Sequence, residues 1–336
     1  MPISNHNRQL QQIRSAEQYY ELRQHSNLPA FDARLLISHR PDCHWAFMED
    51  GFLKARCSLW WREAPSILNG KAGLIGHYAA ADADSAAALL GQCCQQLVKQ
   101  GCNFAIGPMD QNTWRDYRFI IDDGVRPRFF LEPNSQAMWP EQFRRDGFKE
   151  IAWYTSSLVN DLNVRSRRLA RVKTRMGKSG ITIRNLNMDQ LDSELKSIFA
   201  VVKRAFQENP FYVPVSEADF LEMYRPLEEM ITTDLILLAE HHGRVIGFIF
   251  AVPDVSQASN GLKIDTVVVK TFGVFPDRIY GGVGQVLLEE VHHRAAAANY
   301  RYAIHALVRE SAPMKKIIAR YGVPFRRYAL FGKELT

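Results

Sequence analysis

The sequence predicts an α/β (α+β) fold of two domains in tandem, each a mixed, mostly antiparallel sheet flanked by helices. Three observations predict it. The length of 336 residues is sufficient for two ordinary hydrophobic cores. Strand-like and helix-like segments alternate along the second half. A fainter copy of the same order occurs in the first half, so the chain repeats itself.

The second half, residues 181–336, carries the clearer series of elements. Residues 181–186 alternate β-branched and polar residues, as a strand does, and residues 189–207 form an amphipathic helix with Asp189 as its cap. The elements expected after them are two strands joined by a His-Gly turn within 235–252, a strand over 263–274, a helix over 285–298, a strand over 300–308, a helix over 312–321 and a strand over 325–333.

A glycine cluster separates the long strand from the helix that follows it. Gly281, Gly282 and Gly284 precede Val286 and Leu287, which begin the apolar face of that helix. Residues without side chains let backbone N–H groups approach a phosphate, and the helix dipole favours its negative charge. The pattern predicts an anion site, and an ordinary tight turn is the alternative.

The first half repeats these elements without the glycines. Residues 45–60 predict a hairpin with a turn glycine, and residues 85–99 predict an alanine- and leucine-rich helix. The repeat has a constant offset of about 198 residues, at which Leu89-Leu90 falls on Leu287-Leu288 and Ala105-Ile106 on Ala303-Ile304. The loop over 79–88 contains alanines and two aspartates in place of glycines, so we expect no equivalent anion site there.

We place the domain boundaries at 1–160 and 181–336, with a basic linker over 161–180. A basic run is usually solvated, and attraction of an anionic partner is the alternative. Much of the net charge of +6 lies in this linker, at Arg165, Arg167, Arg168, Arg171, Lys173, Arg175 and Lys178.

Composition excludes several classes of protein. No apolar run approaches the roughly 20 residues that span a bilayer, and the N-terminus lacks the apolar core of a signal peptide. We therefore expect a cytoplasmic protein with no membrane partner and no DNA partner. The five cysteines lie in the first 102 residues without zinc-ligand spacing, so no metal is expected.

The glycine stretch resembles the acyl-CoA loop of the GNAT N-acyltransferases, with Gly282 and Gly284 at the two glycine positions and Val274 and Pro276 before them. Ile279 occupies the position where the family has Gln or Arg. The resemblance implies acetyl-CoA or another acyl-CoA as co-substrate. The residues expected to bind it are Phe272, Gly273, Val274, Arg278, Tyr280, Gly281, Gly282, Val283, Gly284, Gln285 and Ser311.

The same resemblance implies positions for the catalytic residues. In the family the strand before the loop bulges, and a backbone N–H near Val274 would stabilise the oxyanion. The usual carboxylate position falls at Val268, and the position of the general-acid tyrosine falls at Ile318. The candidates that remain are Asp265 on the strand, His305 on the next strand and Tyr321, three residues beyond Ile318.

Two segments are candidates for binding the acceptor. The polar loop after the strand at 105–106 contains Trp114, Tyr117 and Arg118, and the segment between the first two helices of the second half contains Phe211 and Tyr212. Packing against the sheet is the alternative for both. The loop, with Phe-Leu-Glu-Pro-Asn at 130–134, also resembles a little-characterised bacterial group of tandem GNAT-like proteins.

The expected function is an N-acyltransferase. It would transfer an acetyl or other acyl group from acyl-CoA to a small-molecule or peptide amine held between a degenerate first domain and the second. An aminoacyl-tRNA-dependent, Fem-like transferase is one alternative, with tRNA or a carrier protein as partner. A non-catalytic CoA-binding or sensing module is the other, because the usual carboxylate and tyrosine are missing.

Overall fold

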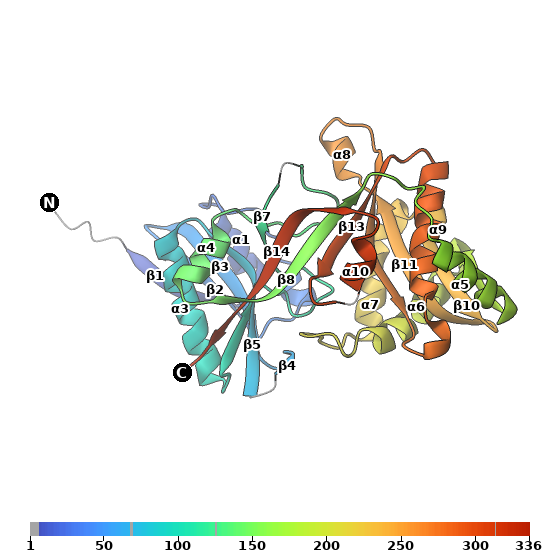
Figure 1. Ribbon diagram of the computed structural model, residues 1–336. Helices are drawn as coiled ribbons and strands as arrows, with labels where there is room; N and C mark the ends of the chain where they lie inside the picture. Colours follow the sequence, from blue (N-terminus) through green and yellow to red (C-terminus); the bar gives the residue numbers. More distant parts are fainter. Residues whose placement is uncertain (1–6, 68–69, 125, 313) are drawn as a thin grey trace.

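The computed structural model describes residues 7–67, 70–124, 126–312 and 314–336. Within them one mixed sheet runs through both halves of the chain in the order β1-β2-β3-β5-β6-β14-β8-β13-β12-β11-β10-β9 (Figure 1). Along this order β5–β6 and β12–β13 are the parallel neighbours, and the other pairs are antiparallel. The predicted fold class is confirmed.

The strands alternate with helices in both halves. The strands are β1 (Arg8–Ile13), β2 (Cys43–Glu49), β3 (Phe52–Trp60), β4 (Ser66–Ile67), β5 (Gly70–Ala80), β6 (Phe104–Gly107), β7 (Phe119–Asp122), β8 (Lys149–Val159), β9 (Ile181–Asn185), β10 (Ile236–His241), β11 (Arg244–Pro253), β12 (Thr266–Val274), β13 (Tyr302–Arg309) and β14 (Val323–Glu334).

The helices flank this sheet. They are α1 (Ala16–Arg23), α2 (Leu35–Ser38), α3 (Ala83–Lys99), α4 (Trp139–Arg145), α5 (Arg167–Lys178), α6 (Leu191–Ala205), α7 (Glu217–Tyr224), α8 (Ser256–Ser259), α9 (Val283–Ala297) and α10 (Met314–Ile318), with short 3-10 helices at Met188–Gln190, Arg225–Met230, Thr233–Leu235 and Arg278–Tyr280. None of the helices in the described part of the chain has the length and apolar character needed to cross a membrane.

The two halves exchange their last strands. β8 ends the first half but pairs with β13 of the second, and β14 ends the chain but pairs with β6 of the first (Figure 1). β8 and β14 also pair with each other, from Val323 opposite Leu158 to Gly332 opposite Lys149. The sheet therefore continues from the first half into the second, with β14 and β8 at the junction.

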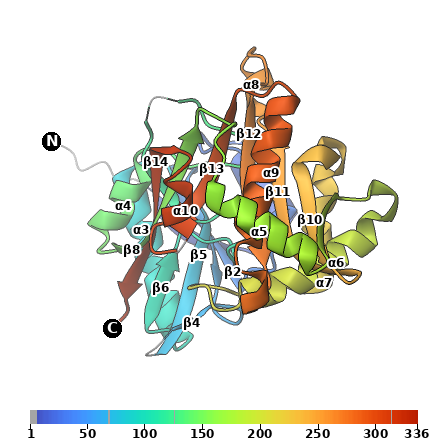
Figure 2. The same ribbon diagram turned by 45° about the vertical axis from the view of Figure 1, so that its right-hand side comes forward.

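The segment expected to be a basic linker is helical in its second part. Leu169 and Met176 of α5 are buried, and Val172 lies on the same face, so the helix packs on α9 and exposes its basic residues (Figure 2). Leu169, Val172 and Met176 are three and four residues apart, so they share one side of the helix and form the face that packs on α9.

Two helix ends differ from expectation. Asp189 does not cap α6: it lies in the 3-10 helix Met188–Gln190, which Asn187 caps by accepting a hydrogen bond from the Asp189 N–H, and α6 begins after Gln190 without a side-chain cap. The helix expected over 312–321 is shorter, because α10 ends at Ile318 before a turn that contains Tyr321; its residue 313 lies outside the described residues.

Candidate functional site

A cavity of about 940 Å³ lies between the two halves of the molecule. It opens where β12 and β13 separate, because their parallel pairing stops at Val269 opposite His305. Residues of β12, β13 and the 113–118 loop of the first half line it together. Concave sites of this size, with apolar walls and few polar groups, are where small ligands usually bind.

A β-bulge lies in the cavity wall. Phe250 of β11 is opposite Thr271 and Ala251 is opposite Val269, so Lys270 has no partner on β11 in the described ladder. The strand therefore bulges at Lys270, four residues before Val274, where the resemblance placed the oxyanion N–H. A bulge redirects a side chain and interrupts the ladder, and bulges are frequent beside active sites.

Lys270 is a lysine in an enclosed environment. Burial, and then the nearby Arg118 guanidinium, lower the pKa of Lys270 from 10.5 to about 7. Its Nζ donates a hydrogen bond to the Leu131 carbonyl oxygen at 2.6 Å. A lysine with such a pKa is partly neutral near pH 7, so it can accept a proton from another group.

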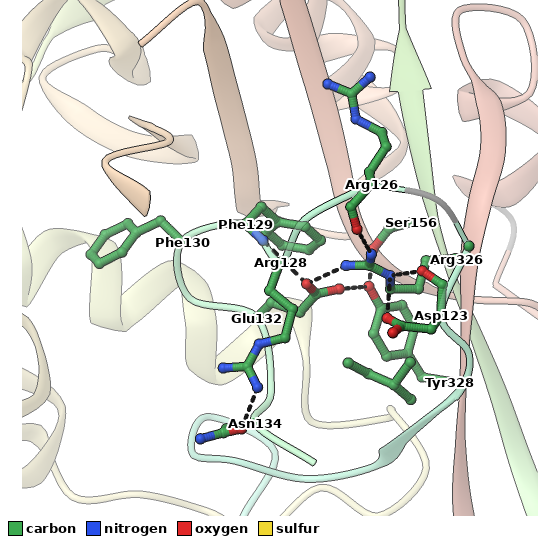
Figure 3. A network of polar contacts seen from close by, with 12 residues as sticks. Asp123, Arg126, Arg128, Phe129, Phe130, Glu132, Asn134, Ser156, Arg326 and Tyr328 are labelled. Atoms are coloured by element: carbon green, nitrogen blue, oxygen red, sulfur yellow. Dashed lines mark hydrogen bonds and ion pairs between the residues drawn. The ribbon is translucent and has the colours of Figure 1, made fainter. Parts of the chain in front are cut away.

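A buried ionic network holds the loop that receives this hydrogen bond (Figure 3). Arg326 of β14 donates to Glu132 at 2.6 Å, and both side chains are fully buried. Arg326 also donates to the carbonyl oxygens of Asp123 and Arg126, and the Tyr328 hydroxyl donates to Glu132. The exchanged strand β14 therefore fixes the 126–134 loop against the cavity.

Asp116 and Arg118 project from the first half into the same cavity. Desolvation by the protein atoms around it raises the pKa of the Asp116 carboxyl, and Lys270 has the opposing effect. The Arg118 guanidinium lies 3.6 Å from the Tyr117 ring centre and donates to the Leu307 carbonyl oxygen at 3.1 Å. The first half thus supplies one anionic and one cationic group.

The glycine loop stands at the N-terminus of α9. Gly282 is the N-cap residue with φ +93°, a left-handed conformation that favours glycine, and no side chain caps this helix. The N–H groups of Val283 and Gly284 have no backbone acceptor in the described part of the chain. These donors and the helix dipole fit an anion.

Helix α5 borders this loop. A Cβ at Gly282 would lie 3.0 Å from Val172, and Arg175 donates a hydrogen bond to the Gly281 carbonyl oxygen. Arg278 and Ser311, both expected to bind the cofactor, are exposed, and the Tyr280 hydroxyl bonds with His241 at 3.2 Å. Two cationic side chains, Arg175 and Arg278, therefore lie beside the glycine loop at the start of α9.

Phe272 connects the loop to the cavity. It lines the cavity, and its ring carbons lie 3.6–3.7 Å from the position of a Cβ at Gly284. An elongated ligand anchored at the start of α9 would pass Phe272 to reach the gap between β12 and β13. Gly273 and Val274, also expected near the cofactor, lie on the same strand.

His305 and Tyr321 lie close together beside a second histidine. His305 lines the cavity but is 1% exposed, and its Nε2 is 2.8 Å from His292 Nε2. Burial lowers the pKa of His305 far below 6.5 and that of His292 to about 4. The Tyr321 hydroxyl donates to Glu289 at 3.0 Å, and burial, then this carboxylate, raise the pKa of Tyr321 to about 12.

Asp265 lies away from this group. It precedes β12, at the end opposite the glycine loop, and it does not line the cavity. Burial alone would raise its pKa, but hydrogen bonds from Gln257 and Thr266 outweigh that effect and lower it. Val268, at the usual carboxylate position, is fully buried.

Of the residues expected to bind the acceptor, some line the cavity and others do not. Trp114 and Tyr117 line the cavity with Arg118, and the Trp114 ring packs edge-on against Phe206 at 5.4 Å between ring centres. Phe211 and Tyr212 do not line it, whereas their neighbours at 205–210 do in part.

Sequence reasoning missed Lys270 and Asp116. The signal for Lys270 was a single charge inside the apolar run Thr266-Val-Val-Val-Lys-Thr-Phe272, because a charged residue in a buried strand needs an explanation. Asp116 stood inside a loop already singled out for its aromatic residues and arginine.

No family model matches the chain. It is 23% identical to Protein YghO of Escherichia coli (strain K12) over 293 residues, 77% of this chain and 74% of that protein. It is 22% identical to the bacterial ceramide synthase of Caulobacter vibrioides over 195 residues, 57% of this chain and 50% of that protein. The match thus spans only half the length of the synthase.

Solved structures share the fold. The tandem GNAT protein from the clavulanic acid biosynthesis pathway matches 98% of this chain and 99% of its own, with 11% identity and a TM-score of 0.51. A glucosamine N-acetyltransferase region of a fungal multi-domain β-N-acetylglucosaminidase matches 98% of this chain and 38% of its own, with 13% identity and a TM-score of 0.59. The chain has the tandem GNAT fold.

Proposed function

We propose that the chain is an N-acyltransferase that moves an acyl group from acyl-CoA to an amine held in the cavity between the halves. One observation carries the proposal. The cavity opens at the separation of β12 and β13, beneath the bulge at Lys270, and Phe272 joins it to the glycine loop at α9. A donor anchored at α9, a reaction chamber and an acceptor wall would therefore be continuous.

The donor would bind with its diphosphate at the start of α9. The N–H groups of Val283 and Gly284 would donate to the diphosphate oxygens, and the pantetheine arm would run past Phe272. The thioester would then lie beside Lys270, whose backbone has no ladder partner on β11. That N–H would stabilise the oxyanion that forms on the thioester carbonyl.

The acceptor would enter as an ammonium ion attracted by Asp116. Neutral Lys270 would take one of its protons, and the amine nitrogen would attack the thioester carbonyl carbon. The C–N bond forms, and the C–S bond breaks as the tetrahedral intermediate collapses. The second amine proton passes from the nitrogen to the departing CoA thiolate, which leaves as the thiol.

Long-chain substrates fit the walls of the cavity. Phe206, Phe250, Leu307 and Ile318 form apolar lining, and about 940 Å³ exceeds what an acetyl group and a short amine occupy. Ceramide is the amide of a fatty acid and a long-chain amino alcohol, and the chain is similar to part of a bacterial ceramide synthase. We propose a fatty acyl-CoA donor and a long-chain amine acceptor.

The test is thiol release by the purified protein with acetyl-, decanoyl- and palmitoyl-CoA and a panel of short and long-chain amines. We expect release with a long-chain pair and loss of at least about 100-fold in Lys270→Met, the scale of general-base catalysis. Lys196→Met, on the exposed face of α6, is the matched control. A thermal shift with acyl-CoA but no release with any amine would contradict acyl transfer.

A further inference from the structure

The first half has its own bulge on the strand that corresponds to β12. Ser58 of β3 pairs with Gly76 and Arg56 pairs with Ala79, so β5 bulges at His77 and Tyr78, opposite Cys57. His77 has φ +48°, a backbone conformation uncommon for a residue with a side chain. Both strands therefore have a bulge, which carries Lys270 in the second half and His77 in the first.

Two further side chains converge on this histidine. His39 Nδ1, just after α2, lies 2.8 Å from His77 Nε2, and Asp110 Oδ2, in the loop after β6, lies 3.6 Å from the same nitrogen. The three ligand atoms lie within 4.8 Å of one another. Two imidazoles and a carboxylate in this arrangement are a frequent ligand set for transition metals.

The outer contacts of the cluster also fit a metal site. His77 Nδ1 is 2.8 Å from the Ser58 hydroxyl, which is itself 2.6 Å from His44 Nδ1. The Ser58 hydroxyl therefore holds the His77 ring with its other nitrogen, Nε2, directed at the cluster. The backbone N–H of His77 donates to Asp110 Oδ1 at 2.6 Å, so Oδ2 is the oxygen of Asp110 that would bind the metal. Such hydrogen bonds orient metal ligands.

We propose that His39, His77 and Asp110 bind a zinc ion. Tetrahedral bonds of about 2.0–2.1 Å place two ligand atoms about 3.3 Å apart, between the 2.8 and 3.6 Å observed. His39, one of the three, lines the cavity, and water from the cavity would supply the fourth ligand. Neighbouring Arg56 is engaged elsewhere, since it donates to Tyr19, to the His77 carbonyl and to the Pro29 carbonyl.

The ion would join three separate elements. It would tie the end of α2 and the bulge of β5 to the loop after β6, which continues to Trp114, Tyr117 and Arg118 in the cavity wall. The ion would bind in the first half whether or not the second half transfers acyl groups.

The test measures bound metal in the full-length protein after zinc loading and removal of free ion. We expect one zinc per chain by mass spectrometry, a rise in Tm with Zn²⁺ that EDTA reverses, and a cobalt-substituted form with visible absorption. His77→Ala and Asp110→Asn should weaken zinc binding by at least about 100-fold. His39→Gln, at a partly exposed residue, provides the same readout if the buried variants fail to fold.

A matched control exists in the second half. His292 and His305 also place two nitrogens 2.8 Å apart, but no carboxylate joins them among the metal-binding groups of the described residues. His292→Ala should therefore retain one zinc per chain. Less than about 0.1 zinc per chain in the loaded wild type, or equal zinc in wild type and His39→Gln, would overturn the proposal.

Discussion

Replacing Lys270 with methionine should stabilise the protein. Burial lowers the pKa of Lys270 from 10.5 to about 7, which corresponds to about 5 kcal/mol at about 1.4 kcal/mol for each pKa unit. Methionine keeps most of the side-chain volume but loses the hydrogen bond to the Leu131 carbonyl oxygen, worth about 1–2 kcal/mol. Water in the cavity screens part of the cost of the charge, so we expect a net gain of about 2 kcal/mol at pH 6.

The gain should depend on pH in one direction. Below pH 7 both states hold the Lys270 proton, and the folded wild type bears the whole cost of burying the charge. Between pH 7 and 10.5 the unfolded chain binds more protons than the folded one, so wild-type stability rises with pH and the advantage of Lys270→Met declines. A functional group that destabilises its own fold is expected of active sites.

Urea denaturation of Lys270→Met, wild type and the Lys196→Met control at pH 6, 7, 8 and 9 measures this difference. The control should stay within about 0.5 kcal/mol of wild type at each pH. A Lys270→Met protein less stable than wild type at pH 6, or a difference that does not change from pH 6 to pH 9, would refute the reasoning.

Three further predictions follow from the same geometry. The rate of acyl transfer should rise with pH through about 7 in the wild type, and a pH–rate profile in which Lys270→Met keeps this limb would exclude the lysine as base. Glu132→Ala should cost about 3–5 kcal/mol in denaturant unfolding because it leaves Arg326 buried without its partner, and a cost under about 1 kcal/mol would contradict that account. Gly282→Ala should lower stability by about 1–3 kcal/mol and abolish the thermal shift with CoA, because φ is +93° and the new methyl would meet Val172. Gly91→Ala, in open space on α3, should be neutral or stabilising and keep the shift, and equal effects at both glycines would argue against a special loop.

Local sequence patterns predicted most of the elements, because periodicity and turn glycines act over a few residues. The hairpin with its Gly51 turn, the strands around His242-Gly243 and the helix after Gly282 are present where they were expected, within a few residues. The exchange of β8 and β14 could not be predicted. Alternation shows that a strand has a buried face, but not which distant strand it pairs with.

The residues of the candidate site also fall into those that local sequence indicated and those that depend on distant strand pairing. Trp114, Tyr117 and Arg118 were found from local composition and do line the cavity. Lys270 was missed because only the bulge, a feature of strand pairing, turns it toward the cavity. His305 looked like a free base in the sequence, whereas the structure pairs it with His292 on a helix that precedes it in the chain.

The central claim is that the space between β12 and β13 is where an acyl group is transferred. A crystal structure with a non-hydrolysable ketone analogue of palmitoyl-CoA, in which a methylene group separates the sulfur from the carbonyl, tests it most directly. We expect the diphosphate to bind the backbone N–H groups of Val283 and Gly284. We expect the carbonyl of the analogue to lie within hydrogen-bond distance of the backbone N–H of Lys270. An analogue bound with its carbonyl outside this gap, or no binding to crystals that remain ordered, would contradict the claim.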